Sequence, residues 1–157
     1  TYKNFEIIIV DNSSSDDTLN IINSFNSDKI RIFNIVNNGN ISKSRNVGIK
    51  NSNGFWIAFL DSDDYWEKNK LELLSKKFDK YDLIFHDMLK LKNKKIIKNF
   101  NFLSSRLKKK DISITEQLSK NGNPIINSSV IVKKIFYQKW ILYLRMNLVL
   151  QTIIILG

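Results

Sequence analysis

FWIAFLDSDDYW, residues Phe55–Trp66, joins a short apolar run to three closely spaced carboxylates. The apolar residues Phe55–Leu60 are typical of a buried strand, which places Asp61, Asp63 and Asp64 at its carboxyl end. In open α/β sheets, ligands bind at that edge. Two interpretations of the carboxylates are open. They hold a hard cation together with substrate phosphates, or they begin a helix, where aspartate is favoured.

The composition is that of one folded domain. The 157 residues are 43% apolar and include ten Phe, which argues against disorder. The chain has no Cys and one histidine, His86, which excludes disulfides, thiolate sites and multi-histidine zinc centres. The net charge of +10 favours an anionic partner or surface. Much of this charge lies in residues 90–98 and 106–110, where a solvated basic face is the alternative.

Strand-like and helix-like patterns alternate along the first part of the chain. We expect strands at Phe5–Val10, Lys29–Val36 and Phe55–Leu60, with helices at Thr18–Phe25 and Ile41–Lys50 between them. Before the second helix the chain turns at Asn37–Asn40, with Gly39 as the natural residue of positive φ. This alternation predicts an α/β fold with a mostly parallel sheet flanked by helices.

The later part of the chain has weaker patterns. They predict a helix at Glu67–Phe78, a strand at Asp82–Met88, a hairpin arm at Lys90–Phe102, a short helix at Asp111–Leu118 and a last strand at Ile125–Val132.

Asp11 follows the first expected strand, as Asp61 follows the third. Because the carboxyl ends of parallel strands meet at one edge of a sheet, both aspartates are expected there. A nucleotide would bind at this edge.

Taken together, three blocks of the chain resemble bacterial glycosyltransferase family 2, whose members have the GT-A fold. The blocks are TYKNFEIIIVDNSSSDDT (Thr1–Thr18), NNGNISKSRNVGI (Asn37–Ile49) and FWIAFLDSDDYW (Phe55–Trp66), with a looser match at NSSVIVKK (Asn127–Lys134). One DxD motif is weak, but three blocks in the family's order and spacing are specific. The resemblance implies a GT-A type, Rossmann-like domain over residues 1–134. That domain is expected to be incomplete, because the family's first strand would precede Thr1.

The resemblance also implies roles for individual residues. Asp11 matches the carboxylate that receives the nucleotide base, Arg45 matches a basic residue of the nucleotide pocket, and Asp61 matches the aspartate that faces the ribose. Asp63 matches the aspartate that holds Mg²⁺ or Mn²⁺ between the two phosphates. Asp64 shares that metal or caps the next helix, and both interpretations stay open.

Several of these residues have a purely local alternative. Asp11 could form a turn with the residues after it, and Arg45 could be a solvated helix arginine. Trp66 is expected to pack rather than to stack on a sugar. His86 is expected to be a strand residue rather than an acceptor contact.

The catalytic residue is unknown. Inverting members of the family place an acidic base after the block that resembles Asn127–Lys134, to take the proton of the attacking hydroxyl. Ile135–Gly157 contains no Asp or Glu. We consider this atypical apolar tail as a membrane span, which Arg145 disfavours, as a core helix, or as a segment read in a shifted frame from near Lys139. We favour the frameshift, because the shifted reading of the last residues resembles the missing acidic motif.

The expected function is a metal-assisted, inverting sugar transfer from a nucleotide-sugar donor, expected to be UDP-linked, to a saccharide or lipid-linked acceptor. It would serve surface polysaccharide or lipooligosaccharide synthesis in the cytoplasm, with peripheral contact to the anionic inner face of the membrane. An inactive remnant of such an enzyme and a nucleotidyltransferase are alternatives. A basic nucleic-acid-binding module is less favoured, because the carboxylates would repel nucleic acid. No nucleic-acid partner is expected.

Overall fold

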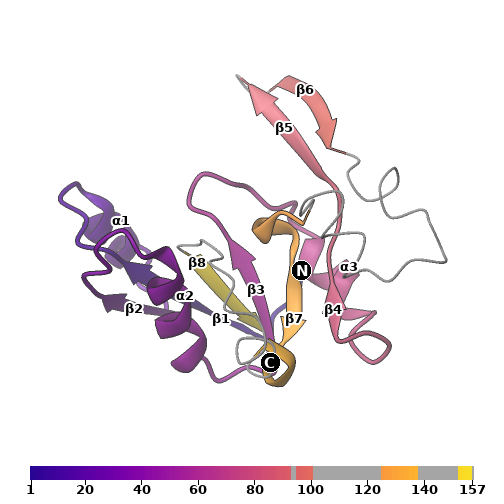
Figure 1. Cartoon of the computed structure of the whole chain (residues 1–157), viewed down its shortest axis with the longest axis horizontal. Helices are drawn as coiled ribbons and strands as arrows, with labels where there is room; N and C mark the ends of the chain where they lie inside the picture. Colours follow the sequence, from indigo (N-terminus) through magenta and orange to yellow (C-terminus); the bar gives the residue numbers. More distant parts are fainter. Residues whose placement is uncertain (93–94, 101–124, 138–151, 157) are drawn as a thin grey trace.

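The computed structural model describes residues 1–92, 95–100, 125–137 and 152–156. A six-stranded sheet in the order β2-β1-β8-β3-β7-β4 forms its centre (Figure 1). The strands are β1 (Phe5–Asp11), β2 (Ile30–Asn34), β3 (Trp56–Leu60), β4 (Leu83–Ile84), β7 (Ile131–Lys133) and β8 (Thr152–Leu156). The helices are α1 (Thr18–Ser24), α2 (Ile41–Lys50) and α3 (Lys70–Ser75). A separate two-stranded sheet consists of β5 (Met88–Lys92) and β6 (Lys95–Phe100).

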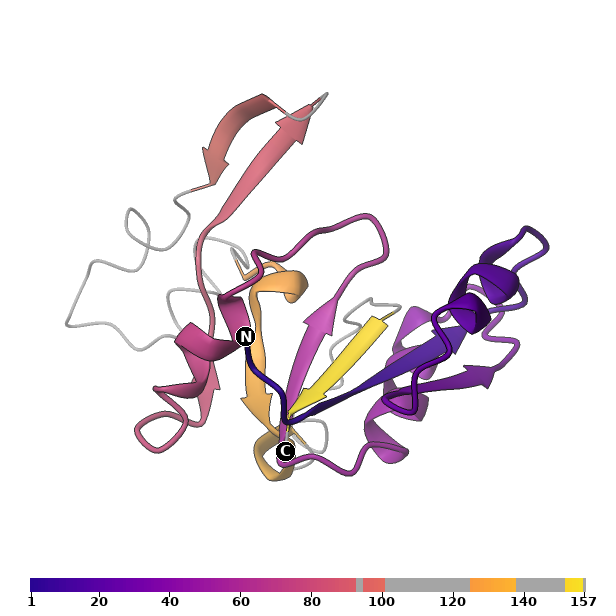
Figure 2. The same ribbon diagram turned by 180° about the vertical axis from the view of Figure 1, so that it is seen from behind.

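The strand directions give a mixed sheet. β1 pairs parallel with β2, whereas β8 is antiparallel to both β1 and β3, and β7 is antiparallel to both β3 and β4. It follows that β1, β2, β3 and β4 all run in one direction. The α/β class is therefore confirmed. Among the described strands, however, only β1 and β2 are parallel neighbours, because β7 and β8 lie between the others (Figure 2).

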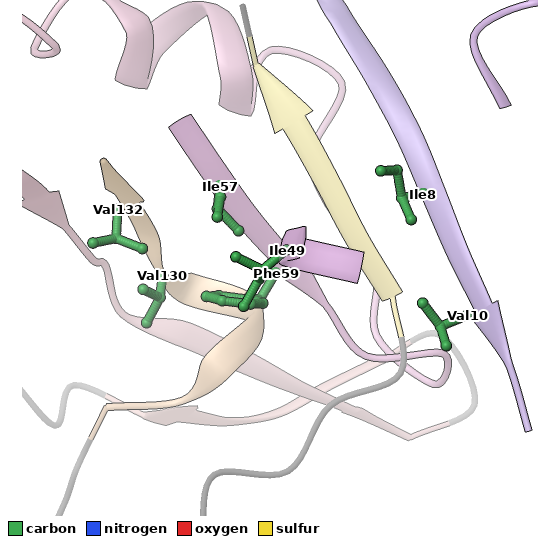
Figure 3. Packing of buried hydrophobic residues seen from close by; sticks show 7 residues of the cluster. All are labelled: Ile8, Val10, Ile49, Ile57, Phe59, Val130 and Val132. Carbon is green, nitrogen blue, oxygen red and sulfur yellow. The ribbon is translucent and has the colours of Figure 1, made fainter. Parts of the chain in front are cut away.

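Residues of β3 contribute to both faces of the sheet, because successive side chains of a strand alternate. Ile57 lies on the face covered by α2, where it belongs to one buried cluster with Ile49 (Figure 3). Trp56 lies on the opposite face, where Leu74 of α3 packs against its cluster. The fully and nearly buried members of the first cluster are Ile8, Val10, Ile49, Ile57, Phe59, Val130 and Val132. The two helices thus cover opposite faces of the sheet.

Glu6 stabilises the edge of the sheet at which β3 begins. Its carboxylate accepts the amide N–H of Asn53 at 2.6 Å and pairs with Arg31 at 3.0 Å. Arg31 also donates to the carbonyl of Asn51 at 2.8 Å. These bonds fix the turn between α2 and β3 against β1 and β2. They lie at the opposite edge from Asp11 and Asp61.

The expected elements of the first part of the chain are confirmed with small shifts of their ends. The expected helix at Ile41–Lys50 is confirmed to the residue as α2. Its N-cap Asn40 accepts the amide N–H of Lys43 at 3.2 Å, and Gly39 before it has φ +78°. The hairpin arm expected at Lys90–Phe102 is confirmed as β5 and β6 within the described residues.

The helix expected at Glu67–Phe78 is too long, since α3 covers Lys70–Ser75. After it, the amides of Lys77 and Phe78 donate to carbonyls three residues back, at 2.9 and 3.1 Å. Such bonds belong to tight turns rather than to an α-helix. Phe78 nevertheless stays in the core, because its ring stacks on Trp56 with centroids 4.2 Å apart.

Two other expectations need correction. The strand expected at Asp82–Met88 is split, because only Leu83 and Ile84 pair with β7, and β5 begins at Met88. The strand expected at Ile125–Val132 begins later, at Ile131 in β7, after a 3₁₀ turn at Asn127–Ser129. The helix expected at Asp111–Leu118 lies outside the described residues.

The end of the chain was not expected to form a strand. Thr152–Leu156 is β8 and pairs with β1 and β3 on its two sides. For these residues the interpretation as a core helix is therefore wrong. The rest of the tail at 138–151 lies outside the described residues. In the ranges that the structure describes, no helix is both long and apolar enough to cross a membrane.

Candidate nucleotide-sugar site

The edge at which β1 and β3 end brings together the residues expected to form a site. β1 ends at Asp11, and Asp61 directly follows the last residue of β3. Because both strands are antiparallel to β8, they are parallel to each other. The two aspartates therefore lie at the same edge, as the sequence predicts, with β8 between their strands.

Asp11 is 6% exposed. Its carboxylate accepts the amide N–H of Ser14 at 3.1 Å and also the hydroxyl of Ser14. These bonds close a turn through Ser13, whose φ of 56° is left-handed. These contacts show that Asp11 forms a turn with the residues after it, as the local alternative predicted. A carboxylate has about four acceptor sites, so these two bonds leave room for a ligand N–H, and base binding by Asp11 stays a prediction.

Asn37 ties the turn after β1 to the start of α2. Its amide N–H donates to the side-chain oxygen of Asn12 at 2.8 Å, and its side-chain nitrogen donates to the hydroxyl of Ser44 at 2.9 Å. Its side-chain oxygen accepts the N–H of Gly39 at 2.8 Å. The side chain is 3% exposed, so this network is buried. It fixes α2, and with it Arg45, relative to the end of β1.

Arg45 is buried in α2, with 2% of its surface exposed. Its three guanidinium nitrogens have no hydrogen-bond partner among the described residues. Burial lowers its pKa to about 10, although the charges of Asp61 and Tyr137 act in the opposite direction. The alternative of a solvated helix arginine is therefore wrong. A buried guanidinium without partners is costly, and an anionic ligand would satisfy it.

Asp61 begins a turn that carries the other two carboxylates. Its amide N–H donates to the hydroxyl of Ser128 at 2.9 Å, and its carbonyl accepts the N–H of Asp64 at 3.1 Å. Burial raises the pKa of Asp61 to about 6, Arg45 lowers it, and Asp64 and Asp63 raise it further. The carboxylates thus repel one another at this edge, and a cation would relieve that repulsion.

A contact that sequence reasoning missed joins this loop to the 3₁₀ turn before β7. The carbonyl of Ser128 accepts both the indole N–H of Trp66 at 2.8 Å and the ammonium of Lys70 at 2.6 Å. The Lys70 ammonium also lies 3.8 Å from the centroid of the Trp66 ring. Lys70 is 8% exposed, and burial lowers its pKa to about 7, opposed by Asp64. One signal was available: Lys70 lies four residues before Leu74, on the apolar face of the expected helix.

Trp66 and His86 are the other two residues that the sequence singled out. Trp66 is half-buried and packs against the cluster around Trp56, so its interpretation as a packing residue is supported. His86 lies just after β4, and its Nε2 is buried without a partner among the described residues. Burial lowers its pKa. Tyr137, which sequence reasoning missed, lies near Arg45 and packs against Phe59 with ring centroids 5.6 Å apart.

The carboxylate oxygens at this edge are suitable ligands for a hard cation, but they do not form a preassembled metal site. Asp63 is exposed, whereas Asp61 and Asp64 are half-buried. Across the described part of the chain, no group of three or more His, Cys, Asp or Glu side chains is arranged to hold a metal ion. Mg²⁺ is commonly bound through one or two carboxylates, with phosphate and water oxygens completing its shell. The residues present therefore fit a cation that arrives with a diphosphate.

Comparison with known proteins agrees with this geometry. Residues 1–128 match the family model described as Glycosyl transferase family 2. The chain is 51% identical over 71 residues to the UDP-Glc:alpha-D-GlcNAc-diphosphoundecaprenol beta-1,3-glucosyltransferase WfaP of Escherichia coli, a match that covers 45% of this chain and 28% of WfaP. It is 38% identical over 73 residues to the UDP-Glc:alpha-D-GlcNAc-diphosphoundecaprenol beta-1,3-glucosyltransferase WfgD of Escherichia coli, a match that covers 46% of this chain and 29% of WfgD.

A third relative comes from Bacillus subtilis. The chain is 35% identical over 74 residues to the putative teichuronic acid biosynthesis glycosyltransferase TuaG of Bacillus subtilis, covering 46% of this chain and 29% of TuaG. The matches cover between 12% and 30% of the length of these three relatives and of five further curated relatives. No solved structure matches the chain.

Proposed function

Because the chain belongs to glycosyl transferase family 2, we propose that it binds a nucleotide-sugar donor at the edge where β1 and β3 end. Arg45 carries this proposal, as a fully buried guanidinium with no partner among the described residues. Guanidinium matches phosphate oxygens in geometry and charge. A diphosphate between Arg45 and the carboxylates of residues Asp61–Asp64, the DSDD turn, would supply the missing acceptors.

The donor is proposed to be UDP-linked. The names of WfaP and WfgD give UDP-Glc as donor and a diphosphoundecaprenol-linked sugar as acceptor. Asp11 is proposed to accept from the ring N–H of the base and Asp61 to face the ribose. The acceptor is proposed to be a saccharide or a lipid-linked sugar of a bacterial surface polysaccharide, and the transfer to be inverting.

Asp63, with Asp64 as a less certain second ligand, would hold Mg²⁺ or Mn²⁺. A divalent cation supplies neutralisation of the charge that develops on the nucleoside diphosphate leaving group. The chain's own residues position that group. Arg45 in α2 would donate hydrogen bonds to the phosphate oxygens. The carboxylates after β3, in the turn that Ser128 holds, would lie on the other side of the diphosphate. No residue is assigned as the catalytic base.

Calorimetric titration of UDP into the purified chain, with and without Mn²⁺, tests the proposal. We expect binding that strengthens with the metal and loses at least about tenfold in affinity in Asp63→Asn, because a charge-assisted contact is removed. Asp79→Asn is the matched control. Asp79 is exposed and precedes β4, so it lies at the opposite edge of the sheet. A folded chain that binds no UDP would refute the donor site, and equal affinity in Asp63→Asn would refute the metal role.

A further inference from the structure

The hairpin of β5 and β6 stands apart from the central sheet. In both views it extends away from the other strands (Figures 1 and 2). Among the described residues its strands pair only with each other. An isolated two-stranded hairpin is at best marginally stable in water. A partner surface would therefore stabilise this arm.

Charge on the hairpin is of one sign. Residues 88–100 contain five lysines and no acidic residue. In the pairing register Lys90 lies opposite Lys98, and Lys92 lies opposite Lys95. Like charges directly opposite each other on paired strands destabilise a sheet. An anionic surface against the arm would turn this repulsion into attraction.

Aliphatic side chains are exposed between these lysines. Leu89 is 52% exposed, Leu91 is 50% exposed and Ile96 is 60% exposed. Leu91 and Ile96 lie opposite each other in the register. Single exposed apolar residues are normal, but these three share one face of the hairpin and the paired lysines share the other, because side chains alternate along a strand. The hairpin is therefore amphipathic. Such surfaces partition into the headgroup region of a bilayer.

The position of the arm relative to the candidate site follows from the strand directions. β4 runs parallel to β3, because both are antiparallel to β7. The hairpin begins a few residues after β4 and thus leaves the sheet at the edge where Asp61 lies. The hairpin and the candidate donor site therefore lie at the same edge of the sheet.

We propose that the β5–β6 hairpin is a docking arm for an anionic lipid bilayer. The described exposed apolar side chains of the arm are aliphatic, whereas single-stranded nucleic acid is bound by stacking on aromatic rings. Each lysine near an anionic membrane strengthens binding about fivefold, and the aliphatic side chains add partitioning into the headgroup region. The inference goes beyond the proposed function. It agrees with a lipid-linked acceptor, but it can be tested without nucleotide or metal.

Sedimentation of the full chain with vesicles tests the docking arm. The vesicles are phosphatidylcholine alone and phosphatidylcholine containing phosphatidylglycerol. We expect binding to the anionic vesicles that falls by about two orders of magnitude in the triple variant Lys90→Gln, Lys92→Gln, Lys95→Gln, since three lysines each contribute about fivefold. The control is Lys76→Gln, Lys77→Gln, Lys80→Gln, which changes the net charge equally at exposed positions after α3.

A second variant tests the apolar contribution. Leu91→Asn keeps every lysine, and we expect it to weaken binding about tenfold, as partial burial of a leucine side chain requires. An unchanged far-UV circular dichroism spectrum and an unchanged Tm in each variant show that the central sheet is folded. Absence of vesicle binding, equal binding to both vesicle types, or equal losses in the hairpin and control variants would each overturn the proposal. Hairpin-dependent binding of a single-stranded oligonucleotide without vesicle binding would also overturn it.

Discussion

Replacing Arg45 by methionine is expected to stabilise the fold and to remove donor binding at the same time. The guanidinium is 2% exposed and without partners among the described residues. Burial lowers its pKa to about 10, well below the ordinary value of an arginine, which corresponds to a cost of about 3 kcal/mol for keeping the charge inside. Methionine has a similar length and no polar hydrogen, and apolar replacement of a buried charge is often stabilising. We therefore expect a gain of about 2–3 kcal/mol.

Thermal and urea unfolding measure this gain. For a chain of this size, about 2–3 kcal/mol corresponds to a rise in Tm of roughly 5–10 °C. The control is Arg31→Met. Arg31 pairs with Glu6 at 3.0 Å and donates to the carbonyl of Asn51 at 2.8 Å. Its loss is expected to cost about 1 kcal/mol, so the two arginine variants should shift Tm in opposite directions.

Binding is the second half of the same prediction. If a diphosphate satisfies Arg45, the methionine variant should lose UDP affinity by about a hundredfold, because two charge-assisted hydrogen bonds are removed. Arg31→Met should bind UDP like the unmodified chain. An Arg45→Met variant that is less stable than the unmodified chain, or that binds UDP equally well, would refute the reasoning. The first result would mean that the guanidinium is satisfied within the protein.

Two further predictions concern the contacts of Ser128. The pKa of Lys70 is lowered to about 7 by burial, from 10.5. Between these values the unfolded chain holds a proton that the folded chain does not, so stability rises with pH. From about pH 6 to about pH 9, the unmodified chain should gain about 3 kcal/mol relative to Lys70→Met in urea unfolding, and parallel pH profiles would contradict this. Ser128→Ala removes the acceptor of the Asp61 amide and should cost about 1–2 kcal/mol, with faster exchange of that amide hydrogen. In Ser129→Ala, which removes the hydroxyl that donates to the nearby carbonyl of Ile126 at 2.5 Å, that exchange should be unchanged.

Much of the first part of the chain could be predicted because local and global preferences agree there. Asn40 caps α2, Gly39 takes the left-handed conformation before it, and the apolar runs of β1 and β3 are long enough to be buried strands. The direction of these strands then places Asp11 and Asp61 at one edge. Family resemblance named Arg45, but only the structure shows that its guanidinium is buried without partners among the described residues.

What the sequence could not show depends on pairing between distant segments. The Ile153–Ile155 run has no periodicity that separates a helix from a strand, and its pairing with both β1 and β3 decides the outcome. From the sequence, Lys70 is predicted to be a polar residue near the start of a helix. It is buried because the carbonyl of Ser128, 58 residues away, accepts its ammonium. α3 is short because tight turns replace the helix after Ser75.

The hydrogen bonds that fix the DSDD turn are made by groups other than the carboxylate proposed to bind the metal. The bonds that fix it use the amide and carbonyl of Asp61, the amide of Asp64 and the hydroxyl of Ser128. None of these bonds uses the carboxylate of Asp63, which is exposed. Removing that carboxylate should therefore change ligand binding without loosening the turn, whereas Ser128→Ala should loosen the turn and leave every carboxylate in place. If Asp63→Asn and Ser128→Ala lowered stability equally, the carboxylate would belong to the support. The affinity lost in Asp63→Asn could then no longer be attributed to a metal.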